Sequence, residues 1–148
     1  MSKLAPLAEL TRVDGLKYIF DPANVSAVYA IPTTIYEPGH PGRASIKTHV
    51  WGVTAAPSPI DEKPDEFLRR LAVLDDFVVL TCPGGPAWIK ATAVSLLAEK
   101  YPGESDQDTK CFLLLSPDAT EIWHIKEDVP SVRAKIDAIR RRPDAADA

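Results

Sequence analysis

The residues whose chemistry could hold a ligand gather between positions 40 and 51. His40 and Arg43 lie in a Gly- and Pro-containing loop, and Lys47, His49 and Trp51 alternate along the strand predicted to follow it. Because successive strand residues point to opposite faces, these three share one face. Cationic groups beside an aromatic ring can hold an anion or a nucleotide base. The alternative, which the sequence favours, is an exposed strand face with ordinary cross-strand pairs.

Other chemistry-bearing residues argue against catalysis and against a resident metal or cofactor. The histidines show neither HxH nor HExxH spacing, and Cys82 and Cys111 do not form a CxxC motif. Both cysteines stand in apolar runs, so we expect buried, unpaired thiols. Pro83-Gly84-Gly85-Pro86 lacks the Lys-Ser/Thr pair and the following helix of a phosphate loop, so we expect a turn there. We therefore predict no catalytic residue, no metal and no cofactor.

Length and composition narrow the class of protein. The chain has 148 residues, of which 45% are hydrophobic, with a formal net charge of -4. These values allow one ordinary domain or two small ones, and they exclude wholesale disorder. There is no basic stripe for nucleic acid, and no apolar run of ~18 residues for a membrane span. The first residues lack the apolar stretch of a signal peptide, so the expected location is the cytoplasm.

An internal repeat is the strongest signal in the chain. The matches keep their order along the two halves while their offset drifts slightly, as a diverged duplication would leave them. The alternative is chance similarity between two β-rich halves. The matched positions are Leu10-Thr11 and Leu80-Thr81, Gly15 and Gly85, Tyr18 and Trp88, Ile19 and Ile89, Val25-Ser26 and Val94-Ser95, Glu62 and Glu127, and Leu71 and Ile136.

The repeat predicts the organisation of the chain. Each copy should contain a strand, a Gly-containing turn, four further strands interrupted by a Gly/Pro loop, and one closing amphipathic helix. The helices should begin near Pro64 and Asp128, where Pro and acidic residues suit a first turn. We expect an α+β fold of two strongly β, SH3-like or half-barrel units, 8–74 and 77–142, related by a local two-fold. Residues 143–148 should form a frayed tail.

The repeat also decides ambiguous segments. Residues 91–100 have helical propensity, but their counterpart 24–35 is rich in β-branched and aromatic residues, so we predict a strand in both copies. On the same alignment, Tyr18 and Trp88 are equivalent aromatic positions. We expect each ring to pack in the core against the helix of its own copy.

One family shares this pattern. The motif Leu-Thr-x-x-x-Gly-x-x-(Tyr/Trp)-Ile, a Val-Ser strand, and Ile-x-Glu leading into a short helix resembles the FlbD-type small proteins of flagellar operons and their bacteriophage relatives. Those proteins hold one such unit, whereas this chain would hold two, at 8–71 and 78–139. The first copy departs from the pattern at Pro57-Ser58-Pro59 and at Lys63-Pro64. The resemblance implies a non-enzymatic binding or assembly role and supplies no catalytic residue.

Together these observations give two functional hypotheses. The first is a non-enzymatic bacterial or bacteriophage module that binds a protein partner or forms a homo-oligomer, in the host cytoplasm or the virion. The second is a protein that sequesters a small anionic or nucleotide ligand in a cleft between the copies. The second would use His40, Arg43, Lys47, His49 and Trp51, and the first need not. Neither hypothesis involves a nucleic acid or a membrane as a partner.

Overall fold

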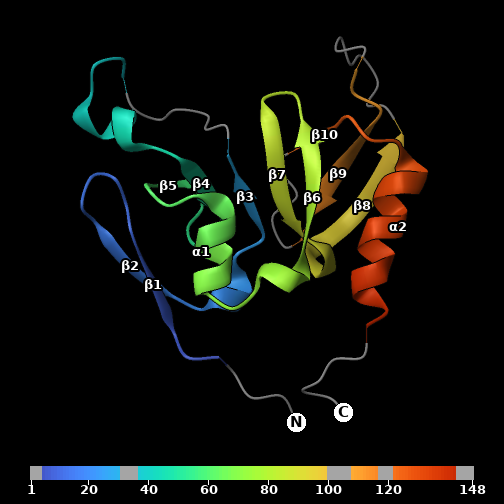
Figure 1. Ribbon diagram of the computed structural model, residues 1–148, viewed down its shortest axis with the longest axis horizontal. Helices are drawn as coiled ribbons and strands as arrows, with labels where there is room; N and C mark the ends of the chain where they lie inside the picture. Colours follow the sequence, from blue (N-terminus) through green and yellow to red (C-terminus); the bar gives the residue numbers. More distant parts are fainter. Residues whose placement is uncertain (1–4, 31–36, 100–107, 117–121, 143–148) are drawn as a thin grey trace. The chain divides into compact units, whose positions relative to one another are not determined.

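The computed structural model describes residues 5–30, 37–99, 108–116 and 122–142, and the expected tail at 143–148 lies outside these ranges. The chain divides into two compact units, Met1–Leu74 and Asp75–Ala148 (Figure 1). Over the described residues, all strand pairing is antiparallel and each unit carries one α-helix. The expected β-rich α+β class is therefore confirmed.

The first unit combines a two-stranded hairpin, a three-stranded antiparallel sheet and a short helix. Strand β4 is central in the sheet, with β3 and β5 on either side. The hairpin joins the sheet where the Val13 N–H donates to the Pro59 carbonyl at 3.0 Å. The elements are β1 (Ala8–Thr11), β2 (Lys17–Phe20), η1 (Pro22–Asn24), β3 (Ala27–Tyr29), η2 (Pro41–Ser45), β4 (Thr48–Trp51), β5 (Ser58–Ile60) and α1 (Pro64–Arg70).

The second unit has the same parts. Here β9 is central between β8 and β10, and the hairpin joins the sheet through a 2.8 Å bond from the Lys126 N–H to the Thr81 carbonyl. The short turn η3 (Leu74–Asp76) leads into the first strand of this hairpin. The elements are β6 (Phe77–Cys82), β7 (Gly85–Lys90), η4 (Ala91–Ala93), β8 (Val94–Glu99), β9 (Cys111–Leu115), β10 (Trp123–Ile125) and α2 (Val129–Arg140).

The two units repeat one another in element order and in local geometry. A single 3-10 turn follows each hairpin, and the next residue donates its N–H to the first residue of that turn: Val25 to Pro22, and Val94 to Ala91. The strand predicted over 91–100 is confirmed at Val94–Glu99, whereas Ala91–Ala93 form the 3-10 turn. Its counterpart predicted over 24–35 is a strand at Ala27–Tyr29, and positions 31–35 and 100 lie outside the described residues. Comparison of the two halves therefore predicted the correct secondary structure here, where local helix propensity did not.

The predicted equivalence of Tyr18 and Trp88 is wrong by one residue. The pairs Leu10–Tyr18 and Leu80–Ala87 occupy the same place in the two hairpins, so Ile19 is the counterpart of Trp88. The cause is turn length: the first hairpin turns through three residues, because Arg12 is bonded to Leu16, whereas the second turns through two. Trp88 consequently lies on the strand face opposite the buried Ala87 and Ile89.

Each helix covers the core of its own unit. The Phe67 side chain of α1 is fully buried and stacks on Phe20 with ring centroids 6.4 Å apart. In α2, Val132 and Ile136 are the buried positions. Both helices carry Pro near their start, as predicted, and the Asp128 carboxylate caps α2 by accepting the Ser131 N–H at 3.0 Å.

Gly52 is a position where only glycine fits. Its φ of +105° is left-handed, and a Cβ there would overlap the backbone carbonyl of Asn24. We predict that Gly52→Ala lowers the free energy of unfolding by at least ~2 kcal/mol, because both backbone strain and backbone overlap are introduced. Urea denaturation measures the loss.

Gly15→Ala is the matched control, since Gly15 has a φ of +93° but open space around a new Cβ. It should cost only the conformational strain, about 1 kcal/mol. Equal losses in the two variants would show that the close approach to Asn24 does not matter.

Candidate functional site

The structure places the five residues predicted for ligand binding in different settings. His40 and Arg43 are exposed, in the turn before η2 and in η2 itself, where the Arg43 N–H donates to the His40 carbonyl at 3.0 Å. Lys47 immediately precedes β4, and His49 and Trp51 lie on one face of that strand. The rings of His49 and Trp51 come together, with centroids 6.2 Å apart.

Lys47 is already paired with a carboxylate. Its Nζ lies 3.1 Å from the Asp61 carboxylate, and both side chains are more than half exposed. A pair this exposed contributes little to stability, on the order of 0–1 kcal/mol. It does, however, neutralise the positive charge that an anion would need at this point of the strand.

His49 is buried and uncharged. The side chain has no exposed surface, and within the described part of the chain neither ring nitrogen has a hydrogen-bond partner. Burial lowers the pKa of His49 to about 4, so the imidazole is neutral at pH 7. A buried imidazole without partners is an energetic cost to the fold.

Trp51 and Tyr29 extend this aromatic cluster across two strands. Tyr29 of β3 pairs with His49 of β4, and the rings of Tyr29 and Trp51 are 6.3 Å apart at 40°. Offset and tilted arrangements at this distance are favourable for aromatic pairs. The cluster therefore has a packing role whether or not anything binds beside it.

A pocket of about 460 Å³ lies in the first unit along β1, beside α1, and sequence reasoning missed it. Its charged lining has a small excess of negative charge, with two guanidiniums and three carboxylates. Arg70 donates twice to Glu62, at 2.9 and 2.8 Å, and that bond raises the Arg70 pKa. Arg12 is bound to Asp14 and to the Tyr18 hydroxyl, each at 2.9 Å. Both cations are thus engaged, and the pocket offers little net attraction to an anion.

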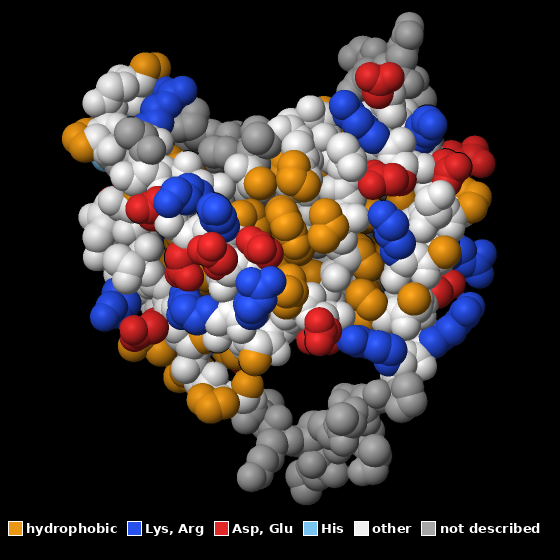
Figure 2. Space-filling view, viewed as in Figure 1, with side chains coloured by type: hydrophobic (Ala, Val, Ile, Leu, Met, Phe, Trp, Pro, Cys, Tyr) orange, Lys and Arg blue, Asp and Glu red, His pale blue; other side chains and the backbone are white. Residues whose placement is uncertain are grey.

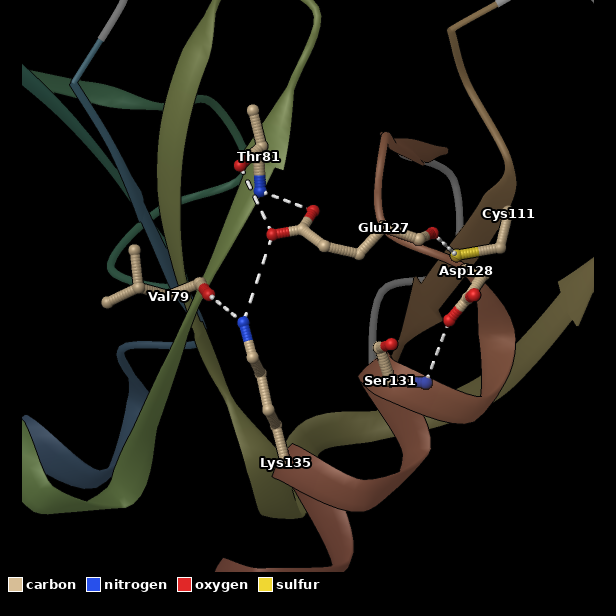
Figure 3. Close-up of polar contacts among 7 residues, drawn as sticks. All are labelled: Val79, Thr81, Cys111, Glu127, Asp128, Ser131 and Lys135. Atoms are coloured by element: carbon tan, nitrogen blue, oxygen red, sulfur yellow. Dashed lines mark hydrogen bonds and ion pairs between the residues drawn. The ribbon is translucent and has the colours of Figure 1, made fainter.

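The second unit uses the residue equivalent to Glu62 differently. Glu127 accepts hydrogen bonds from the Thr81 N–H at 2.9 Å and from its hydroxyl at 3.1 Å, while Lys135 lies 3.8 Å away (Figure 3). Lys135 also reaches the Val79 carbonyl at 3.4 Å. The carboxylate therefore ties hairpin strand β6 to the start and first turns of α2.

The two cysteines are buried free thiols of the second unit. Burial, with a smaller contribution from Glu127, raises the pKa to about 12 for Cys82 and about 11 for Cys111. The Cys111 thiol donates to the Glu127 backbone carbonyl at 3.1 Å (Figure 3). A thiol that is protonated at neutral pH is a poor nucleophile, so neither cysteine is activated for chemistry.

The largest exposed apolar side chains concentrate on the first hairpin, and sequence reasoning did not identify them as a surface. Leu7 and Ile19 are each 67% exposed, and Leu16 is 54% exposed. Hydrophobic side chains reach the surface of the first unit among charged ones in Figure 2. The signal was present in Lys17-Tyr18-Ile19-Phe20, where alternation with the buried Phe20 places Tyr18 inward and Ile19 outward.

Comparisons with protein-family models, with curated proteins and with solved structures each found no match. Among the described residues, no three His, Cys, Asp or Glu side chains are placed to share a metal ion. In the same part of the chain, neither helix has the length and apolar character to cross a membrane. The features that bear on function are therefore those of the chain itself.

We predict that His49→Phe removes an acid-sensitive component of stability. The His49 pKa is about 4 when folded and 6.5 when unfolded, so between these values the unfolded chain binds the extra proton. Wild-type stability should therefore fall as the pH drops from 6.5 to 4, by on the order of 1–3 kcal/mol. Phe is suitable because Phe112 holds the equivalent place in the second unit, opposite β8.

Urea denaturation at a series of pH values measures this difference. His40→Gln, in an exposed turn, is the matched control and should keep the wild-type pH dependence. If His49→Phe shows the same slope as wild type between pH 6.5 and 4, the acid sensitivity arises elsewhere.

We also predict that Glu127→Ala destabilises the second unit by about 1–2 kcal/mol, because the Thr81 N–H loses a charged acceptor. Glu62→Ala is the matched control, since Glu62 pairs with Arg70 and its loss should cost less, at ~0–1 kcal/mol. Thermal unfolding of both variants measures the two losses of stability. A larger loss in Glu62→Ala would overturn the assigned role of Glu127.

Proposed function

We propose that this chain is a non-enzymatic protein-binding module that associates with itself, and that the β1–β2 hairpin of the first unit is the contact surface. The observation that carries the proposal is the exposure of Ile19 in β2, of Leu16 at the hairpin turn and of Leu7 just before β1. Single exposed apolar residues are ordinary, but three on one small element are typical of an interaction site.

The geometry around the hairpin supports this assignment. A pocket of about 440 Å³ lies where the hairpin meets the end of α1, and its apolar lining includes Leu7, Ile19, Pro22 and Leu71. An isolated two-stranded ribbon is marginally stable in water, and an open strand edge invites pairing with another chain. Association would stabilise the hairpin, and it would cover the apolar pocket and the open strand edge.

We also infer that the chain arose by tandem duplication of one small β unit. The support is the shared element order, the matching 3-10 turns, and an equivalent bond in each unit: Thr48 and Cys111 both donate to the backbone carbonyl of the glutamate that precedes the helix. The half-barrel description, the local two-fold between copies and the resemblance to FlbD-type proteins stay predictions. That resemblance agrees with a binding or assembly role.

The alternative, sequestering a small anionic or nucleotide ligand, has less support from the described residues. Of the predicted ligand set, Lys47 is paired with Asp61 and His49 is neutral. An anion at this strand face would have to displace a carboxylate and would gain no charge from the imidazole.

Sedimentation velocity tests self-association directly. The full chain should form an oligomer whose population rises with concentration in the micromolar range. Ile19→Thr should shift the population toward monomer by ~10-fold or more in dissociation constant, because it removes apolar area at the contact.

Leu96→Thr is the matched control, because Leu96 is an exposed strand leucine of the second unit, 42% exposed. It should leave the sedimentation profile unchanged. A chain that stays monomeric at every concentration contradicts self-association, and an equal effect of the two variants contradicts the assigned surface.

A further inference from the structure

The outer edge of β2 carries backbone groups that point away from the hairpin. The Arg12 N–H donates to the Leu16 carbonyl at 2.8 Å, so this is a hydrogen-bonded pair of the ribbon. Bonded and non-bonded pairs alternate along antiparallel strands, so bonded pairs recur at Tyr18 and Phe20. The residues between them direct their N–H and C=O groups to the other edge, where no strand of the first unit is paired within the described residues. Those residues are Lys17 and Ile19, and Asp21 continues the alternation just past the end of β2, where its carbonyl accepts the Asn24 N–H at 2.9 Å.

These three residues form a self-complementary sequence. A basic residue, an apolar residue and an acidic residue stand at every second position of one edge. In an antiparallel pairing with an identical strand, Ile19 can lie opposite its own copy. Lys17 then falls opposite Asp21 of the partner subunit, and Asp21 falls opposite the partner's Lys17, so that each charge meets its opposite.

We propose that two copies of this chain pair edge to edge through β2, antiparallel, with Ile19 on the two-fold axis. This inference rests on the proposed self-association and specifies its interface. Ile19 and the partner's Ile19 would exchange two backbone hydrogen bonds, and the Asp21 N–H would donate to the carbonyl of the partner's Lys17. The contact is isologous, because the same edge serves both subunits, and it therefore closes at a dimer.

Side chains on the exposed face favour the same register. Ile19 pairs across the hairpin with Glu9, and Leu7, two residues before Glu9 and just ahead of β1, follows on the same face by alternation. The paired edges would bring the two Ile19 side chains together, with each Leu7 nearby, and so form one apolar strip. Among the described residues Lys17 is paired with Glu9, at 3.9 Å and with both side chains more than half exposed, so it can also contact the partner's Asp21.

The second hairpin lacks this complementarity. The counterparts of Lys17, Ile19 and Asp21 are Pro86, Trp88 and Lys90, because the second hairpin turn is one residue shorter. Pro86 has no N–H to donate, and Lys90 places a cation where the first hairpin has its acidic residue, with no cation at the position of Lys17. The register with opposite charges facing one another is therefore a property of the first hairpin.

Charge reversal tests the register by sedimentation equilibrium of the full chain. Lys17→Glu and Asp21→Lys should each weaken the dimer ~10-fold or more, because like charges then face one another across the axis. The double variant restores opposite charges and should recover most of the wild-type affinity. Asp21 also accepts the Ala23 N–H at 2.9 Å, so circular dichroism should first show that each variant is folded.

Cysteine cross-linking gives a second measurement. Opposed residues of a hydrogen-bonded antiparallel pair lie ~5.5 Å apart at Cα, within disulfide range, so Ile19→Cys should form a covalent dimer under mild oxidation. Leu16→Cys is the control: Leu16 is also more than half exposed, but in this register it would lie ~20 Å from its copy and should not cross-link. Wild type should also give no cross-link, because Cys82 and Cys111 are buried.

The outcomes separate this inference from the function on which it rests. A monomeric wild-type chain overturns both. An oligomer in which Ile19→Cys does not cross-link, or in which the double charge variant fails to recover affinity, overturns the β2 register while self-association stands. Cross-linking at position 19, absence of cross-linking at position 16, and recovery in the double variant support the pairing.

Discussion

The attachment of each hairpin to the last strand of its own unit is the constraint on which the rest of the structure depends. A two-stranded ribbon cannot persist alone in water, and a unit of this size has only a small core. Each hairpin is therefore bonded to the end of the three-stranded sheet, through Val13 and Pro59 in one unit and through Lys126 and Thr81 in the other. Once these bonds form, the helix can cover the hairpin and sheet together, as Phe67 does by stacking on Phe20.

The two units reinforce this attachment to different degrees. In the second, the Glu127 carboxylate bonds to the β6 backbone and lies near Lys135 of α2, so that strand and helix are tied together. In the first, Glu62 is bound to Arg70 instead, and a pocket remains open along β1. Under the proposed duplication, a surface that loses internal contacts in one copy becomes available for another partner.

Much of the fold could be predicted from the sequence, because it depends on local rules applied twice. Pro64 and Asp128 indicated where the helices begin, and the repeat identified Val94–Glu99 as a strand against its own propensity. The equivalence of Tyr18 and Trp88 failed because the second hairpin turn is one residue shorter than the first, and the identities Gly15 with Gly85 and Ile19 with Ile89 masked the shift. Turn length depends on backbone hydrogen bonds, and residue identities between the two halves do not show where those bonds form.

The candidate site was harder to predict, because residue type does not reveal burial. Lys47, His49 and Trp51 alternate as a ligand-binding face would, yet His49 is fully buried and Lys47 faces Asp61. The pattern at Lys17, Ile19 and Asp21 was more informative about a possible contact surface. There, the register of the hairpin decides which side chains and which amides face outward. An edge lysine is usually regarded as protection against unwanted pairing. Here the acidic residue four positions later changes that expectation, because in the proposed antiparallel pairing centred on Ile19 each lysine faces an aspartate, whereas a parallel neighbour in register would place Lys17 beside the partner's Lys17.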